Sequence, residues 1–518
     1  MESLMDAACL RQTSIPGTSK LFGDFLYRYD RVQRFYEAGP RPALPPERRA
    51  EIVAALAEQN GPHPALDELA KDNAVAFVTG QQVGLFSGPA YTIYKALTAI
   101  RLAERSRRNG TPAVTVFWLA SEDHDFAEVN HVWAFDSKHR PTQVVVGEAI
   151  NGDRPVGGIE IGSWPIGELR QAMSDLPFCD EVVQLVERAY QPGGTMAGSF
   201  RALLEELLKP YGVLFLDPLH RSIRKLAAPL LAKALLAGPA LTRALLERNK
   251  ELEQAGYHAQ VHVEQKTSPF FLLDGDRRVP LRRAGEDLIA RDRRYSAEEL
   301  AAEADHISPN ALLRPVVQDY LLPTEAYVGG PAEIAYFAQS QVLYQRLLGY
   351  MPRIVSRCGF TILDSRTQKL MARYRVTLPD LFHGEEALRE KMANALVPPD
   401  LEAKFATAHA HIVRELDTLC DEVKNFDPTL GASLGKSSAK MIYQLAKAQA
   451  KVARETMRRD QRAAQDTDYL YNSLYPHKHL QERLYSILPF LAKHGLQFIS
   501  DVYESVQTEC PDHVLLSL

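Results

Sequence analysis

The sequence is poor in cysteine. Its 518 residues include five cysteines, and no two of them form a CxxC pair. Their scattered positions and odd number argue against a disulfide framework and against a cysteine-rich zinc site. Each thiol is therefore expected to pack as a small apolar side chain, and the chain to work in the reducing cytoplasm. The five are Cys9, Cys179, Cys358, Cys420 and Cys510.

Long apolar runs and an excess of positive charge are missing as well. No stretch reaches the about 18 apolar residues that a membrane span needs. Residues 1–10 lack the basic flank and the apolar run of a signal peptide. The net charge of −5 gives no overall reason to expect nucleic-acid binding. We therefore expect neither a membrane nor a nucleic acid as a partner.

The length of the chain exceeds what one simple core accommodates, and it predicts two to four domains. Shifts in composition and periodicity suggest four parts. They are a helical lead-in (1–70), an α/β core with insertions near 140–166 and 265–310 (71–383), a coiled coil (384–466), and a helical tail that packs on the core (467–518).

The α/β core is indicated by a strand–loop–helix–strand pattern. An apolar run at 74–78 ends in a glycine-punctuated loop, a helix follows from 91 to about 108, and a second apolar run occupies 113–120. In open parallel sheets, ligands bind outside the carboxyl ends of the strands. Both runs end in polar residues, so we expect these residues to face one crevice.

The first polar cluster is the loop with Gly80, Gly84 and Gly88, which matches neither GxGxxG nor the P-loop pattern. It either lets the backbone approach an anion or forms only a tight turn. As a ligand site, it would bind a substrate carboxylate or phosphate through its amides, with support from the next helix. The candidate substrate-binding residues are Gln81, Gln82, Gly88, Tyr91 and Lys95.

The second cluster, Glu122, Asp123 and His124, is the densest group of titratable side chains. Adjacent carboxylates and an imidazole at a strand end suit general acid–base catalysis or the binding of a substrate amine. Two alternatives remain, namely a metal-dependent amide hydrolase that uses residues 122–125, and a helix cap in a solvated turn. No HExxH motif is present, and we assign no metal.

Similar polar groups recur near residue 320. A Gly-Gly-Pro turn allows a close backbone approach, and an acidic residue begins the next helix. We expect this region to close the opposite wall of the crevice. Its candidate residues are Gln318, Asp319, Tyr327, Gly330 and Glu333.

Beyond about residue 384, two long helices are predicted at 401–426 and 434–462. Apolar residues in the second follow a heptad spacing. The first helix is acidic toward its end and the second is basic, so an antiparallel hairpin would place opposite charges face to face. The basic run is also compatible with nucleic-acid binding, and a non-catalytic scaffold is a further alternative. The heptad residues are Leu434, Met441, Leu445, Ala448 and Val452.

Taken together, four motifs resemble the cysteine-adding (cysteine ligase) family of bacillithiol biosynthesis. They are TGQQVGLFSGPAYTIYK (79–95), FWLASEDHDFAEVNH (117–131), LRPVVQDYLLPTEAYVGGPAE (313–333) and PHKHLQER (476–483). The resemblance implies a Rossmann-like core of the nucleotidylyltransferase type with connecting-peptide insertions. It also implies a C-terminal α-helical antiparallel coiled coil that mediates homodimer formation.

The same resemblance implies an activity, the last step of bacillithiol biosynthesis, in which cysteine is joined to glucosaminyl-malate by an amide bond. It also implies ATP or ADP as a cofactor and a second nucleotide pocket beside the coiled coil. Residues that map to this second pocket are Leu363, Asp364, Ser365, Tyr469 and Tyr485.

Overall fold

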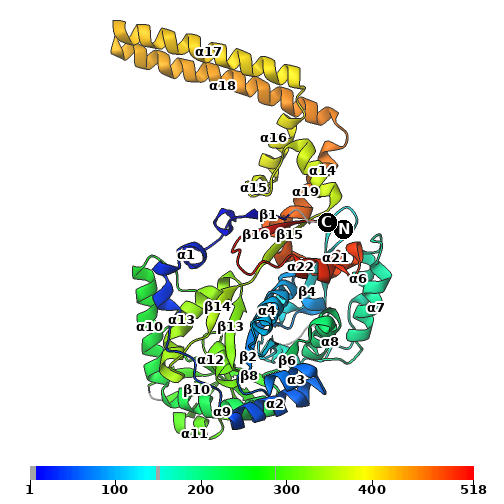
Figure 1. Cartoon of the computed structure of the whole chain (residues 1–518). Coiled ribbons are helices and arrows are strands. Elements are labelled where there is room, and N and C mark those ends of the chain that lie inside the picture. Colours follow the sequence, from blue (N-terminus) through cyan, green and yellow to red (C-terminus); the bar gives the residue numbers. More distant parts are fainter. Residues whose placement is uncertain (1–6, 148–151, 286) are drawn as a thin grey trace. The chain divides into compact units, whose positions relative to one another are not determined.

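The computed structural model describes residues 7–147, 152–285 and 287–518 (Figure 1). Contacts divide the chain into two compact units. The first unit runs to Thr361 and includes Glu482–Leu516, and the second comprises Ile362–Gln481 with Ser517–Leu518. The boundary therefore falls inside strand β15 (Gly359–Leu363) and again within the C-terminal tail.

A five-stranded parallel sheet forms the centre of the first unit. Its spatial order is β14-β13-β2-β3-β6. The two central strands pair over their whole length, from Val75 opposite Ala113 to Gln82 opposite Ala120. The strands are β2 (Val75–Gln82), β3 (Ala113–Ala120), β6 (Leu214–Leu216), β13 (Thr324–Gly329) and β14 (Arg353–Ser356). The strand–helix–strand unit predicted from residues 74–120 is confirmed.

Strand periodicity explains how both faces of the sheet are covered. Val75 and Phe77 pack with Ala99 and Leu102 of helix α4 (Tyr91–Arg108). The alternate side chains of β2 point to the opposite face and join a larger core. Because both faces are covered, the first half of β2 and most of β3 read as nearly continuous hydrophobic runs.

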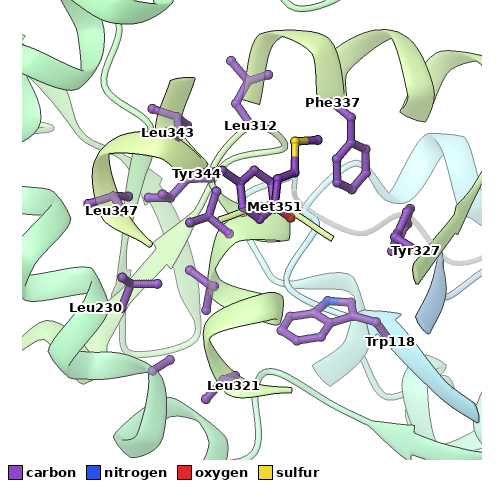
Figure 2. Close-up of a cluster of buried hydrophobic side chains, with 14 of the residues drawn as sticks. Trp118, Leu230, Leu312, Leu321, Tyr327, Phe337, Leu343, Tyr344, Leu347 and Met351 are labelled. Atoms are coloured by element: carbon purple, nitrogen blue, oxygen red, sulfur yellow. The ribbon is translucent and has the colours of Figure 1, made fainter. Parts of the chain in front are cut away.

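The larger core is built from helices that follow the strands. They include α9 (Arg221–Leu236), α10 (Gly238–Gln254), α12 (Arg314–Leu321) and α13 (Pro331–Leu347). Figure 2 shows Trp118 of β3 and Tyr327 of β13 beside Phe337 and Leu321 of these helices. The aromatic end of this core lies directly beneath the carboxyl edge of the sheet.

Two antiparallel segments interrupt the parallel sheet. Strands β4 (His131–Phe135) and β5 (Pro141–Val145) pair with each other, so the first segment begins about ten residues before the insertion predicted near 140–166. Residues Val156–Gly158 form a short 3-10 helix instead of a strand. In the second segment, β7 (Phe270–Asp274) pairs with β8 (Arg277–Pro280) and with β12 (Ile307–Pro309). Three short strands, β9 (Arg282–Ala284), β10 (Asp287–Ala290) and β11 (Arg293–Tyr295), form a separate sheet.

The N-terminal segment departs from its helical prediction at one point. Strand β1 (Ala7–Leu10) pairs antiparallel with β16 (His513–Ser517). Helices α1 (Lys20–Tyr27), α2 (Pro46–Asn60) and α3 (Pro64–Leu69) supply the expected helical part. Along the described chain, no single helix combines the length and apolar character needed to cross a bilayer, and only the pair α9 and α10, bent by 76°, reaches that composition together.

The second unit contains the predicted helical hairpin. Helices α17 (Pro399–Phe426) and α18 (Pro428–Arg459) lie side by side (Figure 1). Asp427 forms the turn, and its carboxylate accepts hydrogen bonds from the amides of Thr429 and Leu430. Among the described residues, no ion pair joins the two arms, contrary to the charge complementarity expected. Instead, Arg458 and Arg459 pair with Glu455 of their own helix.

Candidate active site

A cavity of about 490 Å³ opens at the carboxyl ends of the parallel strands. Its walls combine the end of β2, the turn after β3 and the start of α13 with the β7–β8 hairpin. Nine of the residues predicted from the sequence line it, namely Gln81, Gln82, Tyr91, Glu122, Asp123, His124, Tyr327, Gly330 and Glu333. The structure therefore brings together two polar clusters that lie about 40 positions apart and a third that lies about 200 positions further along the chain.

A buried ion pair between Lys95 and Glu333 supports the cavity from behind. Lys95 Nζ lies 2.7 Å from Glu333 Oε2 and also donates to the Gly80 carbonyl and to Gln81 Oε1. Gly80 itself has no room for a side chain, because a Cβ there would stand 2.7 Å from the Trp118 carbonyl oxygen. Lys95 does not line the cavity, so it orients the residues that do.

The carboxylate of Glu333 accepts hydrogen bonds from several groups of this wall. Tyr327 Oη donates to Oε1 at 2.6 Å, and the Gly330 amide donates to Oε2 at 2.8 Å. Burial alone would raise the pKa of Glu333, but the Lys95 charge and these hydrogen bonds outweigh it, and the net pKa is lowered. Burial lowers the pKa of Lys95 more than Glu333 raises it. Glu333 is therefore held as a carboxylate.

Asp123 and His124 face the cavity and remain partly exposed. Gln82 Nε2 donates to Asp123 Oδ2 at 2.6 Å, which fixes the carboxylate. Arg278 Nη1 lies 3.0 Å from His124 Nδ1. Because a guanidinium only donates, Nδ1 accepts this bond and the ring proton resides on Nε2. His124 therefore offers a donor, and Asp123 offers an acceptor.

Glu122 lies deeper than its two neighbours and is buried. Burial raises the pKa of this carboxyl group, while the charges of Arg278 and Arg224 oppose the increase. Arg278 is also held by Ser308 Oγ and the Pro309 carbonyl, and it covers the Phe271 ring at 3.7 Å. The charges of Glu122 and Arg278 thus act on each other, while Ser308 and Pro309 hold the guanidinium that contacts His124. In the described part of the chain, no group of three His, Cys, Asp or Glu side chains is placed to hold a metal ion.

The cavity is also lined by four arginines, which the sequence predictions did not select. They are Arg278, Arg314, Arg357 and Arg483. Arg357 pairs with both oxygens of Glu482, at 2.8 and 2.6 Å. The partners of Arg314 are neutral, namely Gln318 Oε1 at 3.0 Å and the hydroxyls of Tyr336 and Tyr327. Among the described residues, no carboxylate lies within ion-pair distance of Arg314.

The prediction that Gln318 and Asp319 form the opposite wall is wrong. Both are buried inside α12 and do not line the cavity. Asp319 accepts hydrogen bonds from Gln318 and from the Tyr344 hydroxyl, and burial raises its pKa to about 6. Gln318 instead acts through Arg314, whose guanidinium it orients.

Gly88 is also displaced from its expected position, because it lines a smaller neighbouring cavity rather than the main one. The five residues mapped to a second nucleotide pocket are divided between the two units. In the second unit, Tyr469 Oη donates to Asp364 at 2.8 Å, and Leu363, Asp364 and Tyr469 are buried. Ser365 begins helix α14 (Ser365–Tyr374). Tyr485 belongs to the first unit, where it packs against Phe135 and Phe490.

A parallel sheet with a charged cavity at its carboxyl edge defines an α/β protein of the Rossmann-like class. Comparison with known families gives the same result. Residues 5–358 match the family model described as "Bacillithiol biosynthesis BshC, N-terminal Rossmann-like domain". Residues 360–518 match "Bacillithiol biosynthesis BshC, C-terminal coiled-coil domain". The chain belongs to the bacillithiol biosynthesis BshC family, which confirms the predicted fold class and the resemblance.

Relatives cover nearly the whole chain. A protein of Solibacter usitatus is 51% identical over 98% of this chain and 99% of its own length. A protein of Koribacter versatilis is 35% identical over 98% of both chains, and one of Salinibacter ruber is 31% identical over 96% of both. All three carry the name "Putative cysteine ligase BshC". The prediction of a ligase agrees with these names.

Proposed function

We propose that this protein joins the carboxyl group of cysteine to the amine of glucosaminyl-malate, the last step of bacillithiol biosynthesis. The names of its relatives support a cysteine ligase. The observation that carries the proposal further is the cation-rich cavity at the carboxyl edge of the sheet, above all Arg314.

Arg314 suits the malate part of this substrate. The guanidinium is partly buried, faces the cavity and has only neutral hydrogen-bond partners. Glu333 stabilises the charge of Arg314 without forming an ion pair with it, so a substrate carboxylate gains a charge-assisted and bidentate contact there. The neighbouring Arg357 adds positive potential, although Glu482 already neutralises much of its charge.

The polar side chains of the opposite wall suit the amide-forming step. The sugar amine must lose a proton as its nitrogen attacks the acyl carbon, and Asp123 is the accessible carboxylate that accepts it. Negative charge then develops on the acyl oxygen, and the Nε2–H of His124 is the donor that stabilises it. The oxyanion then collapses: the bond between the acyl carbon and the oxygen that carries the activating group breaks, and that oxygen leaves with AMP or phosphate as the new C–N bond is completed.

A free carboxylate is not an acyl donor in water, so we propose that ATP activates cysteine before the amine attacks. Segment 363–365 and Tyr469 of the second unit remain the proposed location of a further nucleotide site, with Arg366 covering the Tyr469 ring at 3.9 Å.

A ligation assay tests the proposal. The full chain is incubated with cysteine and glucosaminyl-malate, with and without ATP, and the amide is sought by mass spectrometry. We expect amide only in the presence of ATP. Amide without ATP would refute the activation step, and no amide in either sample would refute the substrate assignment.

We further propose that the helical hairpin mediates a homodimer. Several large apolar side chains are exposed along α17 and α18, and a second copy of the hairpin would cover them. They are Leu419, Phe426, Leu430, Met441 and Tyr443. Sedimentation velocity on the full chain should give about twice the monomer mass of 57.9 kDa. Replacing Met441 and Tyr443 by Glu should give monomers, whereas an unchanged dimer would place the interface elsewhere.

A further inference from the structure

A second, smaller cavity adjoins the first. Its volume is about 150 Å³, and it shares Gln81, Gln82, Tyr91 and Arg483 with the larger one. Its remaining walls come from loop 84–89, from α5 (Phe126–Val129) and from the start of β4. The site thus has two compartments that meet along one shared wall.

Gln82 of the shared wall contacts one acidic side chain in each cavity. Gln82 Nε2 donates to Asp123 of the larger cavity at 2.6 Å and to Glu128 of the smaller one at 2.9 Å. The side-chain amide of Gln82 therefore donates both of its protons, one to each carboxylate, and fixes the positions of both. Each carboxylate also lines its own cavity, Asp123 the larger one and Glu128 the smaller one.

The smaller cavity is shaped by a strained loop. Phe86 and Ser87 have positive φ values of 45° and 75°, and Gly88 follows at 64°. Strain of this kind is costly for residues other than glycine and persists where the surroundings enforce it. Here, Phe86 packs edge-on against Tyr190, and Ser486 Oγ donates to the Phe86 carbonyl oxygen. These contacts fix the loop in the conformation in which Gly84 and Gly88 line the smaller cavity.

We propose that the smaller cavity is the cysteine subsite, an inference that rests on the function proposed above. The cysteine ammonium binds Glu128, the carboxyl group lies at the shared wall near Gln81 and Arg483, and the thiol lies against Val132 and Trp133. Glu128 is then a specificity-determining residue for an amino acid with a free α-amino group.

Size, charge and connectivity support this arrangement. The volume of about 150 Å³ is below the about 300–1,000 Å³ of cavities for larger ligands, which suits a substrate of few heavy atoms. Glu128 provides the negative charge that an ammonium group requires, and Val129, Val132 and Leu484 provide an apolar surface for a thiol. The carboxyl group of cysteine must meet an amine from the larger cavity, and the shared wall is where the two substrates meet.

Binding measurements on the full chain test the assignment without requiring turnover. Titration calorimetry with cysteine, and separately with glucosaminyl-malate, is carried out on the wild type, Glu128→Gln and Arg314→Gln. Glu128 is exposed, and glutamine preserves its shape, so the variant should fold. Glu168→Gln, an exposed residue of helix α6 (Ile166–Ala172), serves as a control for the loss of one negative charge.

We expect Glu128→Gln to weaken cysteine binding by about tenfold or more, because a charge-assisted hydrogen bond is lost, and to change glucosaminyl-malate binding less than about twofold. Arg314→Gln should show the reverse pattern, and Glu168→Gln should match the wild type. Cysteine affinity that is unchanged in Glu128→Gln, or that falls in Arg314→Gln instead, would overturn the subsite. So would wild-type protein that binds no cysteine, alone or with glucosaminyl-malate. Binding that follows the expected pattern without any ligation would count against the proposed function alone.

Discussion

Replacement of Asp123 by asparagine is expected to lower kcat for amide formation by about 10²–10⁴-fold, the usual contribution of a positioned general base. Asparagine retains an oxygen that can accept from the His124 amide, an interaction of 2.7 Å in the wild type. The local turn should therefore survive while the capacity to accept a proton is lost. Steady-state kinetics with saturating substrates measures the effect, and thermal unfolding checks that the fold is unchanged.

A companion variant separates the two roles assigned to this wall. His124→Ala should lower kcat by about 10²–10³-fold through loss of one hydrogen-bond donor to the developing oxyanion. The His124 side chain is 38% exposed, so its removal leaves no large cavity. Turnover within about threefold of the wild type in both variants would show that Asp123 and His124 take no part in the reaction.

Replacement of Lys95 by methionine is expected to destabilise the first unit by about 3–5 kcal/mol, because Glu333 loses its nearest cation and the only ion pair that the described residues form with it. The Lys95 side chain is only 1% exposed, and it is the common donor to Gly80, Gln81 and Glu333. Activity should fall as well, since three residues at the cavity wall lose their anchor. Urea unfolding followed by intrinsic fluorescence measures the change in the free energy of unfolding.

A matched control for this experiment is Lys71→Met. Lys71 pairs with Glu68, but its side chain is 54% exposed, and such surface pairs contribute about 0–1 kcal/mol. Lys95→Met should therefore be the more damaging change by a wide margin. A loss of less than about 1 kcal/mol in Lys95→Met, similar to the control, would contradict the anchoring role.

The central sheet could be predicted because its determinants are local. The apolar runs of β2 and β3, and the glycine at position 80, lie within about 50 residues of one another. The helical hairpin was similarly accessible through its heptad pattern and the Asp427–Pro428 turn. These signals depend on side-chain periodicity alone, which the sequence displays directly.

The errors arose where tertiary contacts decide the position of a side chain. Pro315 stands in the first turn of α12, a favoured position for proline, and this helix holds Gln318 inside the core, whereas the sequence predicted it at the wall of the crevice. Asp319 looked like a site residue, but Tyr344 and Gln318 satisfy it inside the core.

The arginines of the site were missed for a related reason. Arg278 belongs to a hairpin that reaches His124 from 154 residues away, and Arg357 is fixed by Glu482 from 125 residues away. Pairings over such distances leave no periodic trace in the sequence. Arg314 stands within a motif that was recognised, but its neutral hydrogen-bond partners become visible only in three dimensions.

The most direct test of the account uses cysteine labelled with ¹⁸O at both carboxyl oxygens. The full chain is incubated with this cysteine, glucosaminyl-malate and ATP, and all products are analysed by mass spectrometry. If the carboxyl group is activated by ATP and then attacked by the sugar amine, the amide retains one ¹⁸O and the other appears in AMP or in phosphate. Amide formation with no label in either nucleotide or phosphate, or the absence of the amide, would contradict the account.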